Sequence, residues 1–278
     1  MRIADSRRRR IAAKAGRQVN LAAGVLALSV LADSGVEHYR GSFRNKAMYT
    51  PLAIAGLTLA ASLAGVADHR ARRHPVRDAV YAGAALAGLI GLSFHAYNVL
   101  KRPGRLSWHN VFYGAPVGAP IALLLSGLLG RLAETVRGGA RRFLGLPTER
   151  LLGLVSAVGL AGTAGEAGLL HFRGAFQNPV MLLPVTAPPA AAVLMGAVAI
   201  DPDVQIAGLA RGALKFTAAL GLIGVGFHAF GVARAMGGWR NWRQNVLNGP
   251  PMPAPPSFTG LAIAGLAALE LLSERRDD

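Results

Sequence analysis

The sequence contains no cysteine and has few charged or aromatic residues. Of its 278 residues, 16% are charged and 6% are aromatic. Without cysteine the chain can form neither a disulfide framework nor a thiolate metal site, so a metal would have to be held by histidine, carboxylate, methionine or tyrosine. Soluble domains typically contain about a quarter charged residues. The shortage of charge therefore indicates that this chain is not an ordinary soluble domain.

Sequence motifs of hydrolases and nucleotide-binding enzymes are also missing. No G-x-S-x-G, H-E-x-x-H, P-loop or dinucleotide-binding glycine motif occurs in a suitable context, and the glycine-rich strings lie inside apolar segments. The sequence thus gives little support to hydrolytic chemistry. Whether the protein is an enzyme at all is left open.

Hydrophobic residues are abundant and gather in blocks. They make up 52% of the chain, and the mean hydropathy is +0.37. Each block approaches the roughly 20 residues that cross about 30 Å of hydrocarbon. The blocks are rich in Ala, Leu and Gly and lack period-two alternation, which favours helices over barrel strands. The eight predicted spans are residues 17–32, 51–67, 79–96, 115–132, 151–170, 180–200, 207–226 and 257–272.

The basic residues predict the orientation of these spans. When the spans alternate in direction, one side of the membrane carries 20 of the 30 Lys and Arg residues and the other side carries 10. The positive-inside rule then places both termini in the cytoplasm, and a bacterial inner membrane is the expected location. The net charge of +16 is explained by this asymmetry and by the basic N-terminal anchor, so nucleic acid is not an expected partner.

A repeated motif predicts the architecture. The segment His38–Asn45 (HYRGSFRN) recurs as His171–Asn178 (HFRGAFQN), at an offset of 133 residues. About 65 residues align at this offset without a gap, and a later piece around Asn110 aligns with Asn245 at an offset of 135. Each copy contains four spans, an even number, so the two copies enter the membrane from the same side.

The predicted fold is therefore an all-α integral membrane protein with eight transmembrane helices. They form two tandem parallel four-helix repeats, related by a pseudo-two-fold axis along the membrane normal. The predicted segments are a basic cytoplasmic N-terminal segment (1–16), the first repeat (17–135), a basic cytoplasmic linker (136–149), the second repeat (150–273) and a cytoplasmic tail (274–278).

Ionisable residues at the non-cytoplasmic ends of the spans form the candidate site. The first and third spans of each copy run outward, so their C-terminal ends converge on one face. The residues that meet there are His38, His95, His171 and His228, with the acids Asp33 and Glu166. An acid at the edge of an apolar block needs a partner, and Arg40 and Arg173 are candidates. We also expect the first helix to end near Gly35, which would let Asp33 and His38 lie on a common face.

Two interpretations of the histidine cluster are open. In the first, the cluster is a polar plug whose His and Asn side chains cap helix ends. In the second, the histidines bind a cofactor: a b-type haem held by His38 and His95 and another by His171 and His228, or a divalent transition metal bound by two His and one carboxylate in each copy. The second interpretation predicts two centres near the outer surface, which would exchange electrons with a quinone or an extracytoplasmic redox partner.

The outer loops supply further candidate binding residues. They are rich in aromatic and amide side chains with interspersed Gly and Pro, and they form either the usual interfacial aromatic belt or a lid over the histidines. The candidates in and beside these loops are Asn45, Asn178, Tyr97, Asn98, His109, Asn110 and Asn245.

Redox or metal binding at the outer face is the favoured function, and two other classes are weighed against it. Transport of a small solute or ion would use the paired acids, arginines and asparagines as an outer vestibule, but polar groups are scarce at mid-membrane. A membrane anchor for an extracytoplasmic enzyme would use the outer loops as its docking surface.

Overall fold

The computed structural model describes residues 2–114 and 116–275, and for residues 2–6 only the backbone. Met1 and most of the predicted tail 274–278 therefore lie outside the described residues. Within them, eight helices are long and apolar enough to cross a membrane. These helices are α1 (Arg2–Arg40), α2 (Thr50–Ala67), α3 (Pro75–Leu100), α5 (Gly118–Arg137), α6 (Thr148–Arg173), α7 (Leu183–Ile200), α8 (Val204–Arg234) and α10 (Pro256–Glu274).

The remaining elements are short and lie between the long helices. They are η1 (Lys46–Tyr49), α4 (Trp108–Tyr113), β1 (Arg142–Phe143), β2 (Leu146–Pro147), η2 (Pro179–Leu182), η3 (Gly238–Asn241) and α9 (Trp242–Asn248). The two strands pair antiparallel within the predicted linker 136–149. Each predicted span overlaps one long helix, and these eight candidate spanning helices confirm the prediction of an all-α membrane protein.

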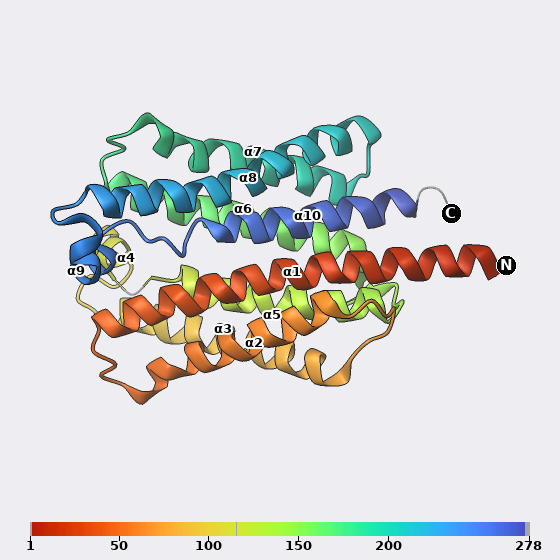
Figure 1. The fold of residues 1–278 in the computed structure, drawn as a ribbon, viewed down its shortest axis with the longest axis horizontal. Coiled ribbons are helices and arrows are strands. Elements are labelled where there is room, and N and C mark those ends of the chain that lie inside the picture. The colour runs from red at the N-terminus through yellow and green to blue at the C-terminus, as the bar shows by residue number, and fades with distance from the viewer. Residues whose placement is uncertain (1, 115, 276–278) are drawn as a thin grey trace.

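The long helices form one bundle with α1, α5, α6 and α10 at its centre. Helices α2 and α3 pack on one side of this centre, and α7 and α8 pack on the other (Figure 1). Buried apolar side chains of the central helices form the core, for example Val19, Leu26, Leu129, Leu160 and Leu261. The peripheral helices expose large apolar side chains such as Leu86 and Leu222, as expected for surfaces that face lipid.

The two ends of the bundle differ. Both described termini, the α2–α3 and α7–α8 connections and the β1–β2 hairpin lie at one end, here called the N-terminal end (Figure 1). The short helices α4 and α9 lie at the opposite end, here called the histidine end (Figure 1). An even number of spans accounts for the common position of the termini.

Helix α1 is longer than the hydropathy pattern indicates. It begins at Arg2 and continues through Gly35 to Arg40. The expectation that the first helix ends near Gly35 is therefore wrong. A single glycine inside a helix costs only about 1 kcal/mol relative to alanine, and no chain reversal occurs until the turn that follows Arg40.

Candidate functional site

The histidines on α1 and α6 have the same hydrogen-bond partner. His38 Nδ1 lies 2.6 Å from the backbone oxygen of Met48, and His171 Nδ1 lies 2.8 Å from the backbone oxygen of Met181. Both methionines are in the 3-10 helices that precede α2 and α7. Each imidazole therefore ties the end of one spanning helix to the start of the next.

The histidines on α3 and α8 behave in the same way. His228 Nδ1 lies 2.8 Å from the backbone oxygen of Pro251, and His95 Nδ1 bonds the backbone oxygen of Pro116. Both prolines belong to the segments that lead from the short outer helices into α5 and α10. All four candidate histidines are half-buried at the histidine end.

These contacts assign the tautomer of every candidate histidine. A carbonyl oxygen can only accept a hydrogen bond, so Nδ1 must carry the proton, and in the neutral ring Nε2 is left with a free lone pair. Among the described residues, no group forms a hydrogen bond with Nε2 of any of the four rings. An Nδ1–H bonded to a carbonyl is the arrangement typical of a metal-bound imidazole.

The four histidines form two pairs. His38 on α1 lies within electrostatic range of His95 on α3, and His171 on α6 lies within electrostatic range of His228 on α8. The sequence predicts the same two pairings. In each pair one ring comes from the first long helix of its half of the chain and the other from the third.

A strained turn follows the first histidine of each pair. Its two central residues have positive φ between 44° and 57° although none is glycine; they are Ser42, Phe43, Ala175 and Phe176. Each such residue costs on the order of 1–3 kcal/mol. The turn directs the Phe43 ring edge-on to His38, with centroids 6.2 Å apart, and Phe176 to His171 at 6.1 Å. Each turn thus places an aromatic ring against the imidazole that precedes it.

The other residues of the repeated motif have structural roles. Asn45 Oδ1 accepts from the backbone N–H of Ala47 at 2.9 Å and caps η1, and Asn178 caps η2 in the same way at 3.0 Å. A Cβ at Gly41 would lie 3.1 Å from the Met48 side chain. The fold thus uses both asparagines and the glycine, whereas the Nε2 atoms of the histidines stay unassigned.

The two acids lie together but apart from the histidines. Asp33 and Glu166 interact electrostatically, and the backbone N–H of Gly118 donates to Glu166 at the start of α5. A Cβ at Gly118 would overlap the Glu166 carboxylate, so this position requires glycine. No cluster of three or more His, Asp or Glu with metal-binding geometry occurs in the part of the chain that the structure describes. Since α1 does not end at Gly35, Asp33 and His38 stay separated on one helix.

The two motif arginines reach across the centre of the bundle. Arg40 forms an ion pair with Glu37 at 3.0 Å and donates to the backbone oxygen of Leu247 in α9. Arg173 lies over the rings of Phe112 and Tyr113 in α4, 5.5 and 5.4 Å from their centroids. Each arginine therefore contacts the short outer helix of the other half of the chain.

The candidate amides of the outer loops are buried anchors. Asn110 Nδ2 donates to two backbone oxygens of the loop before it, at 2.8 and 3.0 Å. Asn245 Nδ2 makes two equivalent bonds at 3.1 and 2.8 Å. The hydrogen bonds of these buried side chains stabilise the conformation of the loops.

The remaining loop candidates lie at or near the surface. The Tyr97 ring is exposed and lies under the Lys101 ammonium, at 5.3 Å. His109 is exposed and packs against the Tyr113 ring at 5.1 Å, and Asn98 is half-buried on α3. His109 is therefore a surface histidine, unlike the four paired ones.

A buried ionic network at the N-terminal end was missed by the sequence reasoning. The Glu134 carboxylate of α5, fully buried, accepts from Arg77 Nε of α3 at 2.8 Å. Arg77 also pairs with Asp68 at 3.0 Å. Arg137, 1% exposed, donates to the backbone oxygen of Gly65 at 2.5 Å. Together these groups tie the ends of α2, α3 and α5 to one another.

The network lowers the pKa of the Asp68 carboxyl. Partial burial alone would raise the pKa of this carboxyl. The N–H of Arg70 and the Arg77 guanidinium, which both donate to it, outweigh burial and hold the pKa below its usual value. Asp68 is thus charged throughout the neutral range.

Among the residues that the structure describes, this network occurs in the first half only. At the repeat offsets, Arg77, Glu134 and Arg137 correspond to Ala210, Leu269 and Leu272. The charged residues lie at the edges of the hydropathy blocks, where they look like ordinary loop or linker charges. The difference between the two copies at these positions is the sequence signal that could have revealed them.

Comparison with protein-family models, curated proteins and solved structures gives no match to this chain.

Proposed function

We propose that the chain is a tandem duplication whose two four-helix halves are parallel, with the N-terminal end in the cytoplasm of a bacterial inner membrane. Three observations support this. The repeated motif has matched histidine contacts in each half. The arginines of the two motifs reach reciprocal positions, because Leu247 corresponds to Phe112 at the offset of 135. The N-terminal end also carries most of the basic residues.

We propose further that each histidine pair binds one b-type haem near the outer surface. The observation that carries the proposal is the hydrogen bond from Nδ1 to a carbonyl in all four rings, which orients Nε2 as a ligand atom. Two imidazoles suffice for haem because the porphyrin supplies the other four nitrogen ligands. They do not suffice for a non-haem divalent metal, which needs further protein ligands.

The surroundings of each pair suit a flat apolar ligand. Exposed aromatic side chains lie next to the histidines or their backbone partner Met48 along the chain, or within two residues of them, on α1, η1 and α3 in the first half and on α6 and α8 in the second. They are Tyr39, Tyr49, Phe94, Tyr97, Phe172, Phe227 and Phe230. Such rings can cover a porphyrin face that would otherwise contact lipid.

Both proposed centres are at one face, so the protein would exchange electrons with a partner at that face. A quinone dissolved in the bilayer or an extracytoplasmic redox protein fits this position. The two histidines at the N-terminal end are engaged by neighbouring groups: His69 Nδ1 lies 3.0 Å from Arg17, and His74 Nδ1 accepts from the backbone N–H of Arg77 at 3.5 Å. Electron transfer across the whole bilayer is therefore not part of the proposal.

The absorption spectrum of the purified protein tests the proposal. We expect the sharp reduced bands of a low-spin haem with two imidazole ligands. His38→Ala should lose one haem, and His171→Ala should lose the other. His109→Ala is the matched control, because this histidine is exposed at the same end. A folded protein without haem absorption would contradict the proposal.

Two other functions would then have to be tested. Flux of a solute or ion in proteoliposomes that is abolished by Glu166→Ala would favour transport, since Asp33 and Glu166 lie together between the halves. Co-purification of a soluble extracytoplasmic subunit would favour the role of a membrane anchor.

A further inference from the structure

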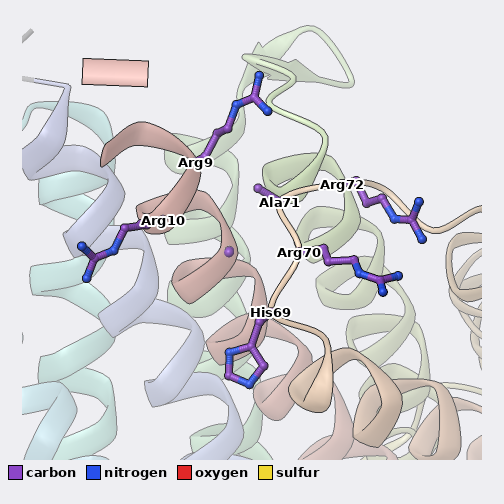
Figure 2. A pocket seen from close by; sticks show the side chains of 7 residues that line it. Arg9, Arg10, His69, Arg70, Ala71 and Arg72 are labelled. Atoms are coloured by element: carbon purple, nitrogen blue, oxygen red, sulfur yellow. The ribbon is translucent and has the colours of Figure 1, made fainter. Parts of the chain in front are cut away.

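A hollow of about 410 Å³ opens at the N-terminal end. It lies between the early turns of α1 and the segment that joins α2 to α3 (Figure 2). Its lining residues are Arg9, Arg10, Ala13, His69, Arg70, Ala71 and Arg72. None of these is acidic and four are arginines, so the hollow is strongly positive.

The arginine side chains extend outward from the residues that line the hollow and do not fill it. In Figure 2, Arg9 and Arg10 leave α1 on different sides, and Arg70 and Arg72 extend from the opposite wall, away from α1. The small side chain of Ala71 lies nearer to α1. The space between the two walls is thus not filled by side chains, and the long, flexible arginines start from its walls.

The wall formed by the α2–α3 segment is held in place from below. The Arg137 guanidinium donates to the backbone oxygens of Asp68 and Arg70, at 2.9 and 3.0 Å. The Arg70 N–H donates to the Asp68 carboxylate at 3.0 Å, and His69 Nδ1 lies 3.0 Å from Arg17. The buried network therefore fixes the backbone that presents Arg70 and Arg72.

On the other flank of α1, acidic residues of α10 pair with basic residues of α1. Arg7 pairs with Glu274 at 3.2 Å, and Lys14 pairs with Glu270 at 2.5 Å. Both acids belong to α10, on the flank away from the α2–α3 segment. On the flank that faces the hollow, the α2–α3 segment instead adds two further basic residues, Arg70 and Arg72.

The hollow lies where spanning helices leave the apolar region. The α2–α3 segment starts directly after Ala67, the last residue of α2, and Arg17 donates to the backbone oxygen of Val66 at 2.7 Å. In a bilayer this is the level of the lipid headgroups, whose phosphates attract basic side chains. Nucleic acid would have to approach from the aqueous phase.

The corresponding connection in the second half lacks these features. At the offset of 133, His69 and Arg70 correspond to Pro202 and Asp203. Asp203 caps α8 by accepting from two backbone N–H groups at 2.8 and 2.9 Å. A general requirement for positive charge at this end would apply to both halves, so the basic hollow is a specialisation of the first.

We propose that this hollow binds the phosphate group of an anionic phospholipid. Charge complementarity, a backbone fixed by buried groups and the position at headgroup level all favour this occupant. The site is separate from the histidine pairs and does not depend on a haem.

Lipid retention by the full-length protein tests the proposal. The protein is reconstituted with equal amounts of phosphatidylglycerol and phosphatidylcholine, extracted gently, and its bound lipids are counted by native mass spectrometry. We expect enrichment of phosphatidylglycerol, which should fall about fivefold for each arginine removed in Arg70→Gln/Arg72→Gln. The control Arg44→Gln/Arg102→Gln removes two exposed arginines at the histidine end and should leave the enrichment unchanged.

Arg70→Lys/Arg72→Lys keeps the charge and should keep most of the enrichment. An equal loss in the Arg44→Gln/Arg102→Gln control would overturn the proposal. So would an RNA oligonucleotide that binds through Arg70 and Arg72 while lipid retention is unaffected by their replacement. If the glutamine variant does not fold, the wild type decides alone, because a lack of phosphatidylglycerol enrichment overturns the proposal.

Discussion

At the scale of single residues, α1 and α2 approach each other closely at Gly65 on α2 and Asn20 on α1. Asn20 is fully buried and accepts a hydrogen bond from Tyr81 at 2.6 Å. A Cβ at position 65 would lie 2.5 Å from the Asn20 side chain. No shift of a surface side chain can relieve this overlap, because Asn20 is enclosed.

Gly65→Ala should therefore destabilise the protein by about 1–3 kcal/mol. Gly56→Ala on the same helix is the control, because a Cβ there meets nothing within 4 Å, and it should not lower stability. Thermal unfolding in detergent measures both variants. Equal stability of the two would show that α1 and α2 do not approach at Gly65.

The titration of Asp68 gives a pH-dependent prediction. Its pKa is lower in the folded protein than in the unfolded chain, because Arg70 and Arg77 donate to the charged form. The charged carboxylate therefore stabilises the fold above about pH 4, and this contribution is lost as the pH falls through the lowered pKa.

Asp68→Asn should lower stability at pH 7 by on the order of 1–2 kcal/mol. The difference from wild type should shrink as the pH falls below about 4. Unfolding temperatures of both proteins across this range measure the effect. A difference that does not change with pH would show that the carboxylate charge has no role.

At the scale of elements, buried charge joins α3 to α5. Glu134 receives two bonds from Arg77, at 2.8 and 3.2 Å, and one from the backbone N–H of His74 at 2.7 Å. Removal of one member of a buried ion pair costs about 3–5 kcal/mol, since the other charge stays buried without its partner.

Glu134→Leu alone should therefore be strongly destabilising. Combining it with Arg77→Ala and Arg137→Leu, the residues that the second half has at the same positions, should restore part of the loss, because no uncompensated charge then stays buried. Glu274→Gln, which removes the exposed partner of Arg7, should cost under about 1 kcal/mol. If the triple variant is less stable than Glu134→Leu alone, the pairing is not the source of the loss.

The helices also show how much of the fold can be predicted from the sequence. Hydropathy predicts the eight spans because burial in lipid is a property of each segment by itself. The predicted end of α1 near Gly35 was wrong because a glycine permits a helix to end but does not require it. The pairing of His38 with His95 follows from topology, whereas that of Arg77 with Glu134 depends on how α3 and α5 pack, which no local pattern contains.

The candidate site could likewise be predicted only in part. The repeated motif identifies His38 and His171, but not that their Nδ1 atoms bond the backbone of Met48 and Met181. Asn45 looks like a ligand in the sequence and is a cap in the structure. The absence of a partner for Nε2 can only be seen once every neighbour of the ring is placed.

At the scale of the whole molecule, the chain's lack of cysteine gives a direct test of topology. Ala47→Cys lies at the histidine end and Ala140→Cys at the N-terminal end, and both alanines are exposed. We expect a membrane-impermeant thiol reagent added to intact cells to label Ala47→Cys alone. Labelling of Ala140→Cys alone would reverse the proposed orientation.

The central claim is that the two halves hold one haem each through a pair of histidines. The ratio of haem to protein in the purified full-length chain measures it most directly, in the wild type and in His38→Ala and His38→Ala/His171→Ala. We expect ratios of two, one and zero, with all three proteins folded. A wild type that is folded and free of haem, or variants that keep the wild-type ratio, would contradict it.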